Sequence, residues 1–297
     1  MKKLLFVFNP RSGKAQIKNK LLDIIDIFVK GGYSVTVHPT QKALDCYRLI
    51  KKTGSEYDLI VSSGGDGTLN ESVRGLLKLE NMPLLGYIPA GTTNDFATSI
   101  GIPKDFIDAA KSIVNGKPFA CDIGQFNENF FTYVAAFGIF TDVSYQTSQN
   151  FKNAFGHLAY ILEGIKRLGS IKSYEMMVEH DGVTIKDEFL FGMVANTNSI
   201  GGYRGLSELN VSLCDGEFEV LLIRNPKNAF EVQGTINALL TQDINSEHLY
   251  FFRTSDVKFY SEEYVPWTLD GENGGNHTEV NVKNLHRAIN IIIKDKK

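Results

Sequence analysis

The first part of the chain alternates between short apolar runs and stretches in which apolar residues recur every three to four positions. The apolar runs predict strands at Lys3–Phe8, Tyr33–His38, Tyr57–Ser62 and Leu84–Ile88. The stretches between them predict helices over Ala15–Val29, Ala43–Lys52 and Leu69–Leu79. Strands that are apolar throughout and separated by helices are typical of a parallel sheet covered on both faces. Such a sheet places its ligand site at the carboxyl ends of its strands.

The pattern changes after Lys117, where extended runs follow one another and helical spacing is rare. Two of these runs flank Asp181-Gly182, a dipeptide that favours a two-residue hairpin turn. The extended runs are Phe119–Phe126, Asn129–Phe140, Tyr174–His180, Val183–Asn196, Glu217–Arg224, Tyr250–Tyr260, Thr278–Val282 and Ala288–Lys294. Helical stretches interrupt them near Ala154–Leu168 and Ala229–Leu240. We therefore expect an antiparallel β-sandwich in this half.

These two patterns predict an α/β domain over residues 1–120 and a mostly antiparallel β-sandwich domain over residues 121–285. Whether residues 286–297 complete the first domain stays open at this point. The 297 residues are 43% hydrophobic and 22% charged, which is an ordinary globular composition. The net charge of −3 gives no general reason to bind nucleic acid, so we expect none as a partner.

The three cysteines, Cys46, Cys121 and Cys214, are too few and too far apart for a disulfide framework or a cysteine-based metal site. Reduced thiols are typical of a cytoplasmic protein. No stretch approaches the roughly 18 apolar residues that a membrane-spanning helix needs. We therefore expect a cytoplasmic protein that does not span a membrane.

The loop after the first strand has the composition of an anion site. It consists of Asn9-Pro10-Arg11-Ser12-Gly13-Lys14 and leads into the first predicted helix. Main-chain N–H groups at a helix N-terminus bind anions, Gly13 permits close approach, and Lys14 adds a positive charge. The loop does not satisfy the G-x-x-x-x-G-K-[ST] pattern, and a plain strand-to-helix turn accounts for it equally well.

The loop after the third strand is the strongest chemical feature of the sequence. It reads Ser63-Gly64-Gly65-Asp66-Gly67-Thr68-Leu69-Asn70-Glu71. Its glycines let the main chain fold tightly against a polyphosphate. Asp66 would repel phosphate, so its natural role is to act through Mg²⁺, directly or through water. Thr68 and Glu71 also have the spacing of a helix capping box, a role that leaves the glycines around Asp66 unexplained.

The loop after the fourth strand is the third candidate for phosphate contact. It reads Pro89-Ala90-Gly91-Thr92-Thr93-Asn94-Asp95-Phe96-Ala97. Thr92 and Asp95 have capping spacing, and a helix cap alone would account for them. Because the ends of the first, third and fourth strands can converge at one edge of a parallel sheet, a shared ligand site is favoured.

Together these residues resemble a known family. The run Gly64-Gly65-Asp66-Gly67-Thr68-Leu69-Asn70-Glu71, followed by Gly91-Thr92-Thr93-Asn94-Asp95-Phe96-Ala97, is similar to the motif pair of the diacylglycerol kinase catalytic domain family. That family includes bacterial soluble diacylglycerol kinases, related bacterial lipid kinases, and the sphingosine and ceramide kinases. The resemblance extends over essentially the whole chain, because the two-part pattern and Asp270-Gly271-Glu272 also match. It implies an ATP-dependent lipid kinase, a phosphotransferase that uses Mg²⁺ and an alcohol group as acceptor, with a nucleotide-binding first domain and a lipid-binding second domain.

The resemblance also implies which residues contact ATP. They are Asn9, Pro10, Arg11, Ser12, Gly13, Lys14, Thr40, Gly64, Gly65, Asp66, Gly67, Thr68, Leu69, Asn70, Glu71 and Thr92. Thr40 follows the second strand, where an adenosine contact is geometrically reasonable. The residues alone would make Thr40 the cap of the helix that begins near Ala43.

A lipid hydroxyl is a poor nucleophile until a base removes its proton. The resemblance makes Glu272 that base, within Trp267-Thr268-Leu269-Asp270-Gly271-Glu272. It places Asp270 in a Mg²⁺-linked network of carboxylates with Asp66 and Asp95. The predicted catalytic residues are therefore Glu272, Asp270, Asp66 and Asp95. The sequence alone favours a hairpin turn at Asp270-Gly271 with Glu272 as a solvated neighbour.

A second metal site is implied at Leu213-Cys214-Asp215-Gly216-Glu217. By resemblance, the side chain of Asp215 and the main-chain carbonyls of Ser212 and Glu217 bind a structural Mg²⁺. That ion prefers oxygen ligands completed by water. A bare Asp-Gly turn fits these residues nearly as well.

Phe151–Lys172 carries basic residues beside apolar ones. A basic amphipathic helix can lie at an anionic membrane, which would bring the enzyme transiently to the inner membrane surface. Such helices more often pack on their own domain with the basic face in solvent. A homodimer is compatible with the sequence, although no pattern requires one.

Several functions stay open. NAD kinases and phosphofructokinases also use a Gly-Gly-Asp-Gly loop, but Gly91-Thr92-Thr93-Asn94-Asp95-Phe96 fits the lipid kinases better. We expect diacylglycerol as acceptor, giving phosphatidic acid, while a sphingoid base or phosphatidylglycerol also fits the motifs. A catalytically silent lipid-binding or regulatory protein is the alternative of another class. The presence of all four predicted catalytic residues argues against it.

Overall fold

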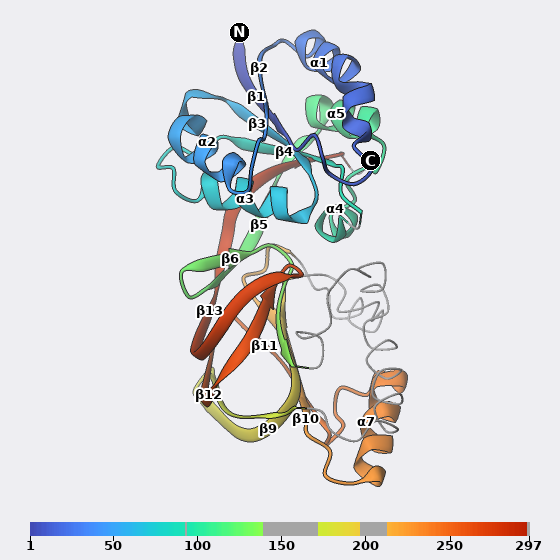
Figure 1. Ribbon diagram of the computed structural model, residues 1–297, viewed down its shortest axis with the longest axis vertical. Helices are drawn as coiled ribbons and strands as arrows, with labels where there is room; N and C mark the ends of the chain where they lie inside the picture. Colours follow the sequence, from blue (N-terminus) through green and yellow to red (C-terminus); the bar gives the residue numbers. More distant parts are fainter. Residues whose placement is uncertain (93, 139–171, 197–212, 296–297) are drawn as a thin grey trace. The chain divides into compact units, whose positions relative to one another are not determined.

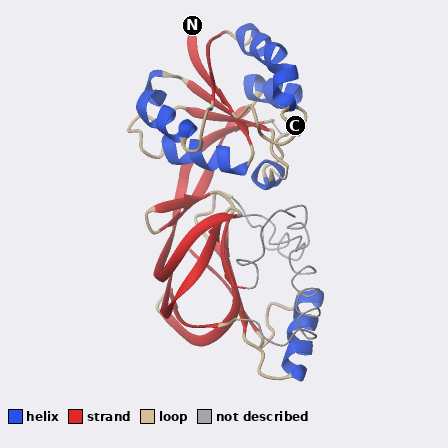
Figure 2. Cartoon of the chain, viewed as in Figure 1, coloured by secondary structure: helices blue, strands red, loops and turns tan. Residues whose placement is uncertain are grey.

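The computed structural model describes residues 1–92, 94–138, 172–196 and 213–295. The chain forms two compact units (Figures 1 and 2). Unit 1 consists of residues 1–122 together with 287–297, and unit 2 consists of residues 123–286. The long strand β13 (Glu272–Ile293) begins in unit 2 and ends in unit 1.

Unit 1 is built on a parallel sheet. Its strands are β1 (Lys2–Phe8), β2 (Tyr33–Pro39), β3 (Leu59–Gly64) and β4 (Leu84–Pro89), paired in the order β4-β3-β1-β2. The end of β13 lies parallel to β4, with Ile291 opposite Leu85. The predicted parallel sheet is therefore present, and the last strand of the chain joins it.

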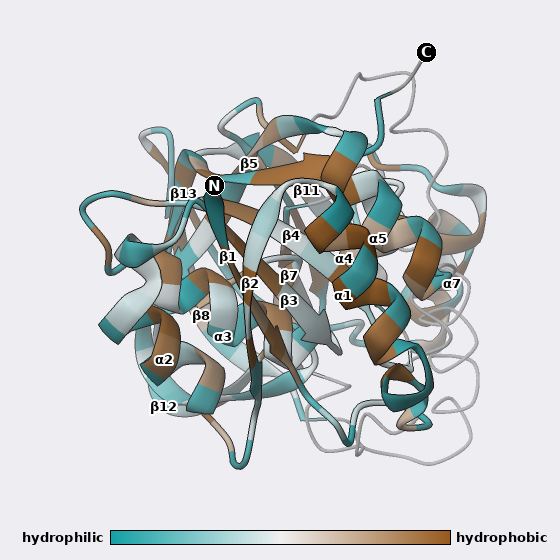
Figure 3. Ribbon diagram, turned by 90° about the horizontal axis from the view of Figure 1, so that it is seen from above, coloured by the Kyte–Doolittle hydropathy of each residue, from teal (hydrophilic) through white to brown (hydrophobic). Residues whose placement is uncertain are grey.

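Helices cover both faces of this sheet, as its apolar strands require. They are α1 (Leu21–Lys30), α2 (Asp45–Thr53), α3 (Asp66–Leu76), α4 (Asp95–Ser99) and α5 (Phe106–Asn115), with 3-10 turns η1 (Gln16–Lys20) and η2 (Gly54–Glu56). Figure 3 shows α2 and α3 on one side of the strands and α1 and α5 on the other. The helix predicted over Ala15–Val29 is divided, because Ala15 is left-handed (φ 55°) and the chain tightens into η1 before α1 begins.

Unit 2 is antiparallel. Its strands are the end of β5 (Lys117–Phe126), β6 (Asn129–Phe131), β7 (Val134–Gly138), β8 (Tyr174–His180), β9 (Val183–Ala195), β10 (Phe218–Arg224), β11 (Leu249–Thr254), β12 (Asp256–Leu269) and the first part of β13. The predicted hairpin at Asp181-Gly182 joins β8 to β9, and both turn residues have positive φ (45° and 78°). This is the requirement of a type I′ turn.

The strand pairings of unit 2 differ from the predicted two-sheet sandwich. Strand β9 pairs with β8 along its first half and with β7 and β10 along its second. Strand β12 likewise pairs with β8 and then with β7. The pairings β7-β9-β8-β12-β7 therefore close into a ring. This is achieved because β9 and β12 are long, at 13 and 14 residues, and each serves two partners.

Three strand boundaries also differ from the sequence pattern. The run Asn129–Phe140 is interrupted at Thr132-Tyr133 between β6 and β7. The run Tyr250–Tyr260 ends and restarts at Ser255, where the Thr254 hydroxyl accepts a hydrogen bond from Asp256 N. The two runs predicted at Thr278–Val282 and Ala288–Lys294 belong to the single strand β13. The predicted helix near Ala154–Leu168 lies outside the described residues.

The core of unit 2 is aromatic. Trp267 lies with its ring centre 4.8 Å from Phe137 and 5.1 Å from Phe259 and Phe126. A second apolar cluster includes Leu221 on β10 and Leu239 on helix α7 (Ala229–Thr241). The helix predicted near Ala229–Leu240 is therefore confirmed, and it packs through its apolar side.

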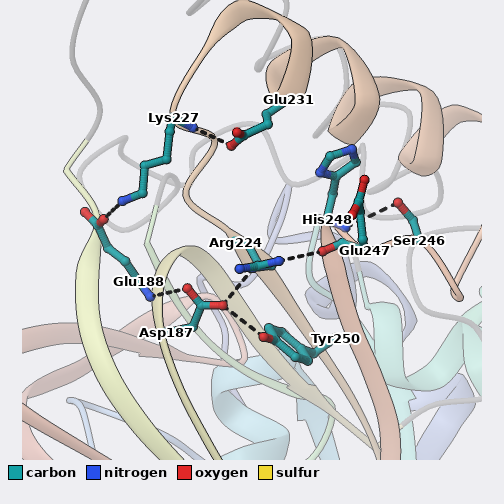
Figure 4. Close-up of polar contacts among 9 residues, drawn as sticks. All are labelled: Asp187, Glu188, Arg224, Lys227, Glu231, Ser246, Glu247, His248 and Tyr250. Atoms are coloured by element: carbon teal, nitrogen blue, oxygen red, sulfur yellow. Dashed lines mark hydrogen bonds and ion pairs between the residues drawn. The ribbon is translucent and has the colours of Figure 1, made fainter.

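A polar network secures the segment that leads into α7 (Figure 4). Asp187 on β9 forms an ion pair with Arg224 Nε at 2.7 Å and accepts a hydrogen bond from the Tyr250 hydroxyl at 2.9 Å. The Lys227 ammonium binds the Glu188 carboxylate and holds the pKa of Glu188 below its ordinary value. The network thus connects β9, β10 and β11 to the start of the helix.

Candidate active site

Three loops of unit 1 contact one another at the carboxyl ends of β1, β3 and β4. Asn9 N donates to Ser63 O at 2.8 Å, and Ala90 N donates to Gly64 O at 2.8 Å. A Cβ atom on Gly13, whose φ is 52°, would lie only 2.5 Å from Ala90 O. The expected convergence of the three strand ends is therefore confirmed, and we call this region the loop junction.

Helix α3 begins inside the loop junction at Asp66, with Gly65 as its N-cap. The predicted capping box of Thr68 and Glu71 is wrong, because Thr68 already lies in the first turn of the helix. Glu71 Oε1 instead accepts a hydrogen bond from Leu44 N at 2.8 Å, at the start of α2. Since Gly65 has no side chain to cap the helix, the N-terminus of α3 has the form that binds phosphate.

Asn94 fixes the third loop against the second. Its main chain is left-handed (φ 54°), and its side chain accepts from Gly91 N and donates to Gly91 O, both at 2.9 Å. Its own N–H donates to Asp66 Oδ2 at 3.1 Å. The hydroxyl of Tyr87 on β4 donates to Gly64 O at 2.9 Å, and burial raises the pKa of Tyr87 well above its ordinary value. Tyr87 therefore stays a neutral donor.

Asn94 is part of the predicted motif, although its own role was not predicted. Asparagine is one of the few residues other than glycine that adopts the left-handed conformation, and this was the available signal. Asn94, rather than Thr92, is the N-cap of α4, so the cap expected from Thr92 and Asp95 is wrong. Asp95 is the first residue of α4, and its side chain lies outside the described part of the structure.

The other predicted nucleotide residues have varied surroundings. Thr40 N donates to Phe8 O at 2.9 Å beyond the end of β2. Thr40 is not a helix cap, because α2 begins at Asp45 with Leu44 as its N-cap. Leu69 is fully buried in the core, so only its main chain remains for ligand contact. Arg11, Gly13, Lys14 and Thr92 are exposed.

Glu272 follows a tight turn in unit 2. Asp270 and Gly271 have φ values of 51° and 82°, and Leu269 pairs with Glu272 across the turn. The hairpin that the sequence favoured here is confirmed, with Glu272 exposed at the start of β13. The pairing shifts two residues later, since Trp267 lies opposite Gly275 and Thr268 opposite Asn273. A bulge of this kind re-aims neighbouring side chains and is common beside active sites.

The Asp270 carboxylate contacts the segment between β6 and β7. Oδ2 accepts from Thr132 N at 2.8 Å and from the Thr132 hydroxyl at 3.0 Å. Oδ1 accepts from Tyr133 N at 2.8 Å and from Val134 N at 3.0 Å. These contacts belong to unit 2, whereas Asp66 and Asp95 belong to unit 1.

The turn at Asp215 is paired with the guanidinium of Arg253. Asp215 Oδ1 accepts from Glu217 N at 3.2 Å, and its Oδ2 is paired with the guanidinium of Arg253. The same guanidinium lies 3.2 Å from Glu217 and 3.4 Å from Glu219. Ser212 lies outside the described residues. Because the Asp215 carboxylate is paired with Arg253, we assign no step to a metal ion at this turn.

Glu219 makes a pH-dependent contribution to stability. It is 1% exposed, and burial raises its pKa from the ordinary 4.5 to about 8, although Arg253 beside it acts in the opposite direction. The folded state therefore binds the proton more tightly than the unfolded state. This contribution is complete below pH 4.5 and is lost as the pH rises to about 8, by at most about 1.4 kcal/mol per pH unit.

We expect Glu219→Gln to remove the loss of stability that Glu219 causes as the pH rises. The measurement is the free energy of unfolding by urea at several pH values between 4.5 and 8 for both proteins. The wild type should lose stability relative to the variant as the pH rises. Glu217→Gln is the matched control, because Glu217 pairs with the same Arg253 but its side chain is 45% exposed. Parallel curves for wild type and Glu219→Gln would contradict the prediction.

Within the described residues, no group of three or more His, Cys, Asp or Glu side chains is arranged to hold a metal ion. Asp66 nevertheless fits Mg²⁺ that arrives with ATP. Its carboxylate is half-buried at the start of α3, and one or two carboxylates completed by substrate phosphates are the usual ligands of this ion.

The profile of the diacylglycerol kinase catalytic domain matches residues 3–126. A diacylglycerol kinase of Bacillus subtilis is 36% identical over 299 residues, which cover 100% of this chain and 98% of that protein. A diacylglycerol kinase of Staphylococcus aureus is 33% identical over 293 residues, with 98% and 92% covered. The chain therefore belongs to the diacylglycerol kinase family. The predicted family and kinase class are confirmed, and kinase membership implies the use of ATP.

A solved structure described as a diacylglycerol kinase from Bacillus anthracis shares the fold. Its TM-score is 0.75 at 22% sequence identity, covering 99% of this chain and 97% of that one. Across the ranges that the structure describes, we find no helix with the length and apolar character needed to cross a membrane.

Proposed function

We propose that this chain transfers the γ-phosphate of ATP to the hydroxyl group of diacylglycerol, giving phosphatidic acid and ADP. The observation that carries the proposal is the loop junction, where three strand ends meet around the uncapped start of α3 and Asp66. The names of the full-length relatives support diacylglycerol as the acceptor.

Unit 1 would bind ATP through main-chain N–H groups. Phosphate oxygens would be bound at the start of α3 and along the Asn9–Lys14 loop, where the exposed Arg11 and Lys14 add positive charge. Asp66 and Asp95 would hold Mg²⁺. When bound, this ion would supply positive charge that offsets the negative charge of the phosphate groups during transfer. The Asn94 N–H would keep the Asp66 carboxylate oriented.

Unit 2 would supply the base and bind the lipid. Glu272 would take the proton of the lipid hydroxyl while that oxygen forms a bond to the γ-phosphorus. The bond between the γ-phosphorus and the bridging oxygen would break, and ADP would leave. An exposed carboxylate at a bulged hairpin suits this role, because it can reach a substrate without unfolding its own strand.

The enzyme would work from the cytoplasm and contact the inner membrane surface only transiently, because its substrate is a membrane lipid. The segment proposed to meet the membrane, Phe151–Lys172, lies outside the described residues apart from Lys172. Lys172 pairs with Glu263 at 2.8 Å, so its charge is already neutralised within unit 2.

Radiolabelled phosphate transfer from ATP tests the proposal. The acceptors are diacylglycerol, monoacylglycerol, ceramide, sphingosine and phosphatidylglycerol in mixed micelles, with NAD and fructose 6-phosphate as soluble controls. We expect Mg²⁺-dependent label in phosphatidic acid. Label in another lipid, or in a soluble control, would replace diacylglycerol as the acceptor. No transfer to any acceptor would favour a non-catalytic lipid-binding protein.

A further inference from the structure

We propose that Asp270 is a positioning residue that holds the Glu272 hairpin against residues 132–134, and that it does not act as a Mg²⁺ ligand. The inference rests on the proposed role of Glu272 as the base. It changes the role implied for Asp270 by the family resemblance, which grouped this carboxylate with Asp66 and Asp95.

The contacts of Asp270 carry the inference. Its two oxygens accept four hydrogen bonds of 2.8–3.0 Å, from Thr132 N, Thr132 Oγ1, Tyr133 N and Val134 N. An ionised carboxylate offers about four lone-pair sites, so these donors match its capacity. Mg²⁺ would have to displace donors that the chain itself supplies.

The same residues are joined by the main chain. Asp270 N donates to Val134 O at 2.8 Å, so Asp270 and the start of β7 are bonded in both directions. The strand before the turn pairs with β7 as well, with Leu269 opposite Ala135. The turn is thus bound to β7 by a ladder that ends in the Asp270 carboxylate.

The interruption between β6 and β7 follows from these contacts. Thr132 and Tyr133 separate the two strands, and their N–H groups point to Asp270 instead of to a neighbouring strand. Thr132 is 1% exposed, so its N–H and hydroxyl need a partner inside the protein. Asp270 supplies it.

The hairpin at Asp181-Gly182 shows that the turn itself does not require such contacts. Its φ values, 45° and 78°, are close to those at Asp270-Gly271, and it also joins two paired strands. Asp181 is exposed, and its carboxylate lies 3.2 Å from the ring of the adjacent His180. The conformation of such a turn therefore does not depend on hydrogen bonds like the four that Asp270 accepts.

The four hydrogen bonds accepted by Asp270 help to fix the position of Glu272. Glu272 is two residues from Asp270 and lies two residues before the bulge in β13. Its position is therefore set by the turn on one side and by an irregular ladder on the other. Because small displacements of a reacting group lower the rate strongly, fixing the turn would contribute to turnover without contact with substrate.

The experiment compares Asp270→Asn with Asp181→Asn, the same change at the matched turn. An amide offers N–H groups where the loop supplies donors, so we expect hydrogen exchange at residues 132–134 to quicken at least about tenfold in Asp270→Asn. We expect kcat for lipid phosphorylation to fall about 10- to 100-fold. The affinity for ATP and the Mg²⁺ concentration for half-maximal rate should stay within about twofold of wild type. Asp181→Asn should change none of these quantities.

A second variant covers the case in which Asp270→Asn fails to fold. Thr132→Val keeps the shape of a buried side chain and removes one of the four bonds, so kcat should fall about two- to fivefold with the Mg²⁺ requirement unchanged. Unchanged exchange at residues 132–134 would overturn the proposal. A Mg²⁺ requirement raised about tenfold, with the rate restored at high Mg²⁺, would also overturn it. Exchange needs no substrate, so it is measured even if the proposed lipid kinase activity fails.

Discussion

Replacing Glu272 by glutamine is expected to lower kcat by about 10²-fold or more while the affinity for ATP is retained. Glutamine has the size of glutamate but cannot take a proton from the lipid hydroxyl. Glu272 is exposed, and the turn before it is formed by Asp270 and Gly271, so the substitution leaves the hairpin intact. The measurements are kcat at saturating diacylglycerol and the dissociation constant of ATP by calorimetry.

Glu279→Gln is the control for this prediction. Glu279 lies on the same strand, β13, and is also exposed. Its substitution by glutamine therefore removes one negative charge from the same strand. Its kcat should match the wild type. Equal turnover of wild type and Glu272→Gln would exclude Glu272 as the base, whereas equal losses in both variants would point to a general effect of charge on lipid binding.

Much of unit 1 could be predicted from local patterns. The strands β1, β3 and β4 each contain a short continuous run of apolar residues, and the helices between them show clear periodicity. The two hairpin turns at Asp181-Gly182 and Asp270-Gly271 are also local features, because the positive φ values that they need are available to few residue pairs. Properties of this kind depend on neighbours in sequence and are therefore readable without a structure.

Contacts between distant residues could not be predicted in the same way. The spacing of Thr68 and Glu71 indicates a capping box, yet Glu71 bonds Leu44 N, which is 27 positions earlier in the chain. The ring formed by β7, β9, β8 and β12 likewise depends on which strands meet in space. Apolar alternation identifies a strand but does not identify its partners.

The candidate site shows the same division. The glycine-rich loops and the carboxylates were visible in the sequence, as were the strands after which they lie. The sequence shows Asp270 only as part of a turn, because its four donors lie 136–138 positions away. Asn94 was visible as a residue, but its bonds to Gly91 and Asp66 depend on the contact between two loops.

Gly91→Ala is expected to disrupt that contact. A Cβ atom on Gly91 would lie 2.5 Å from Gly65 Cα and 2.8 Å from Asn94 Oδ1, closer than such atoms approach in folded proteins. The second and third loops would have to separate, and the bonds from Asn94 to Gly91 and Asp66 would be weakened. We expect an unfolding free energy lower by about 1–3 kcal/mol. We also expect an affinity for ATP lower by at least about tenfold, the scale of one lost charge-assisted hydrogen bond.

Gly65→Ala is the matched control on the other side of the same contact. A Cβ atom there would lie 3.4 Å from Gly91 Cα, an ordinary van der Waals distance, and the main chain of Gly65 (φ −86°) suits alanine. Its thermal midpoint should therefore stay close to that of wild type, while that of Gly91→Ala falls. If Gly65→Ala weakens ATP binding without loss of stability, the added methyl group obstructs the phosphates at the start of α3. Wild-type stability and ATP affinity in Gly91→Ala would instead mean that the loops do not meet at these glycines, and Asp66 would then need another residue to orient it.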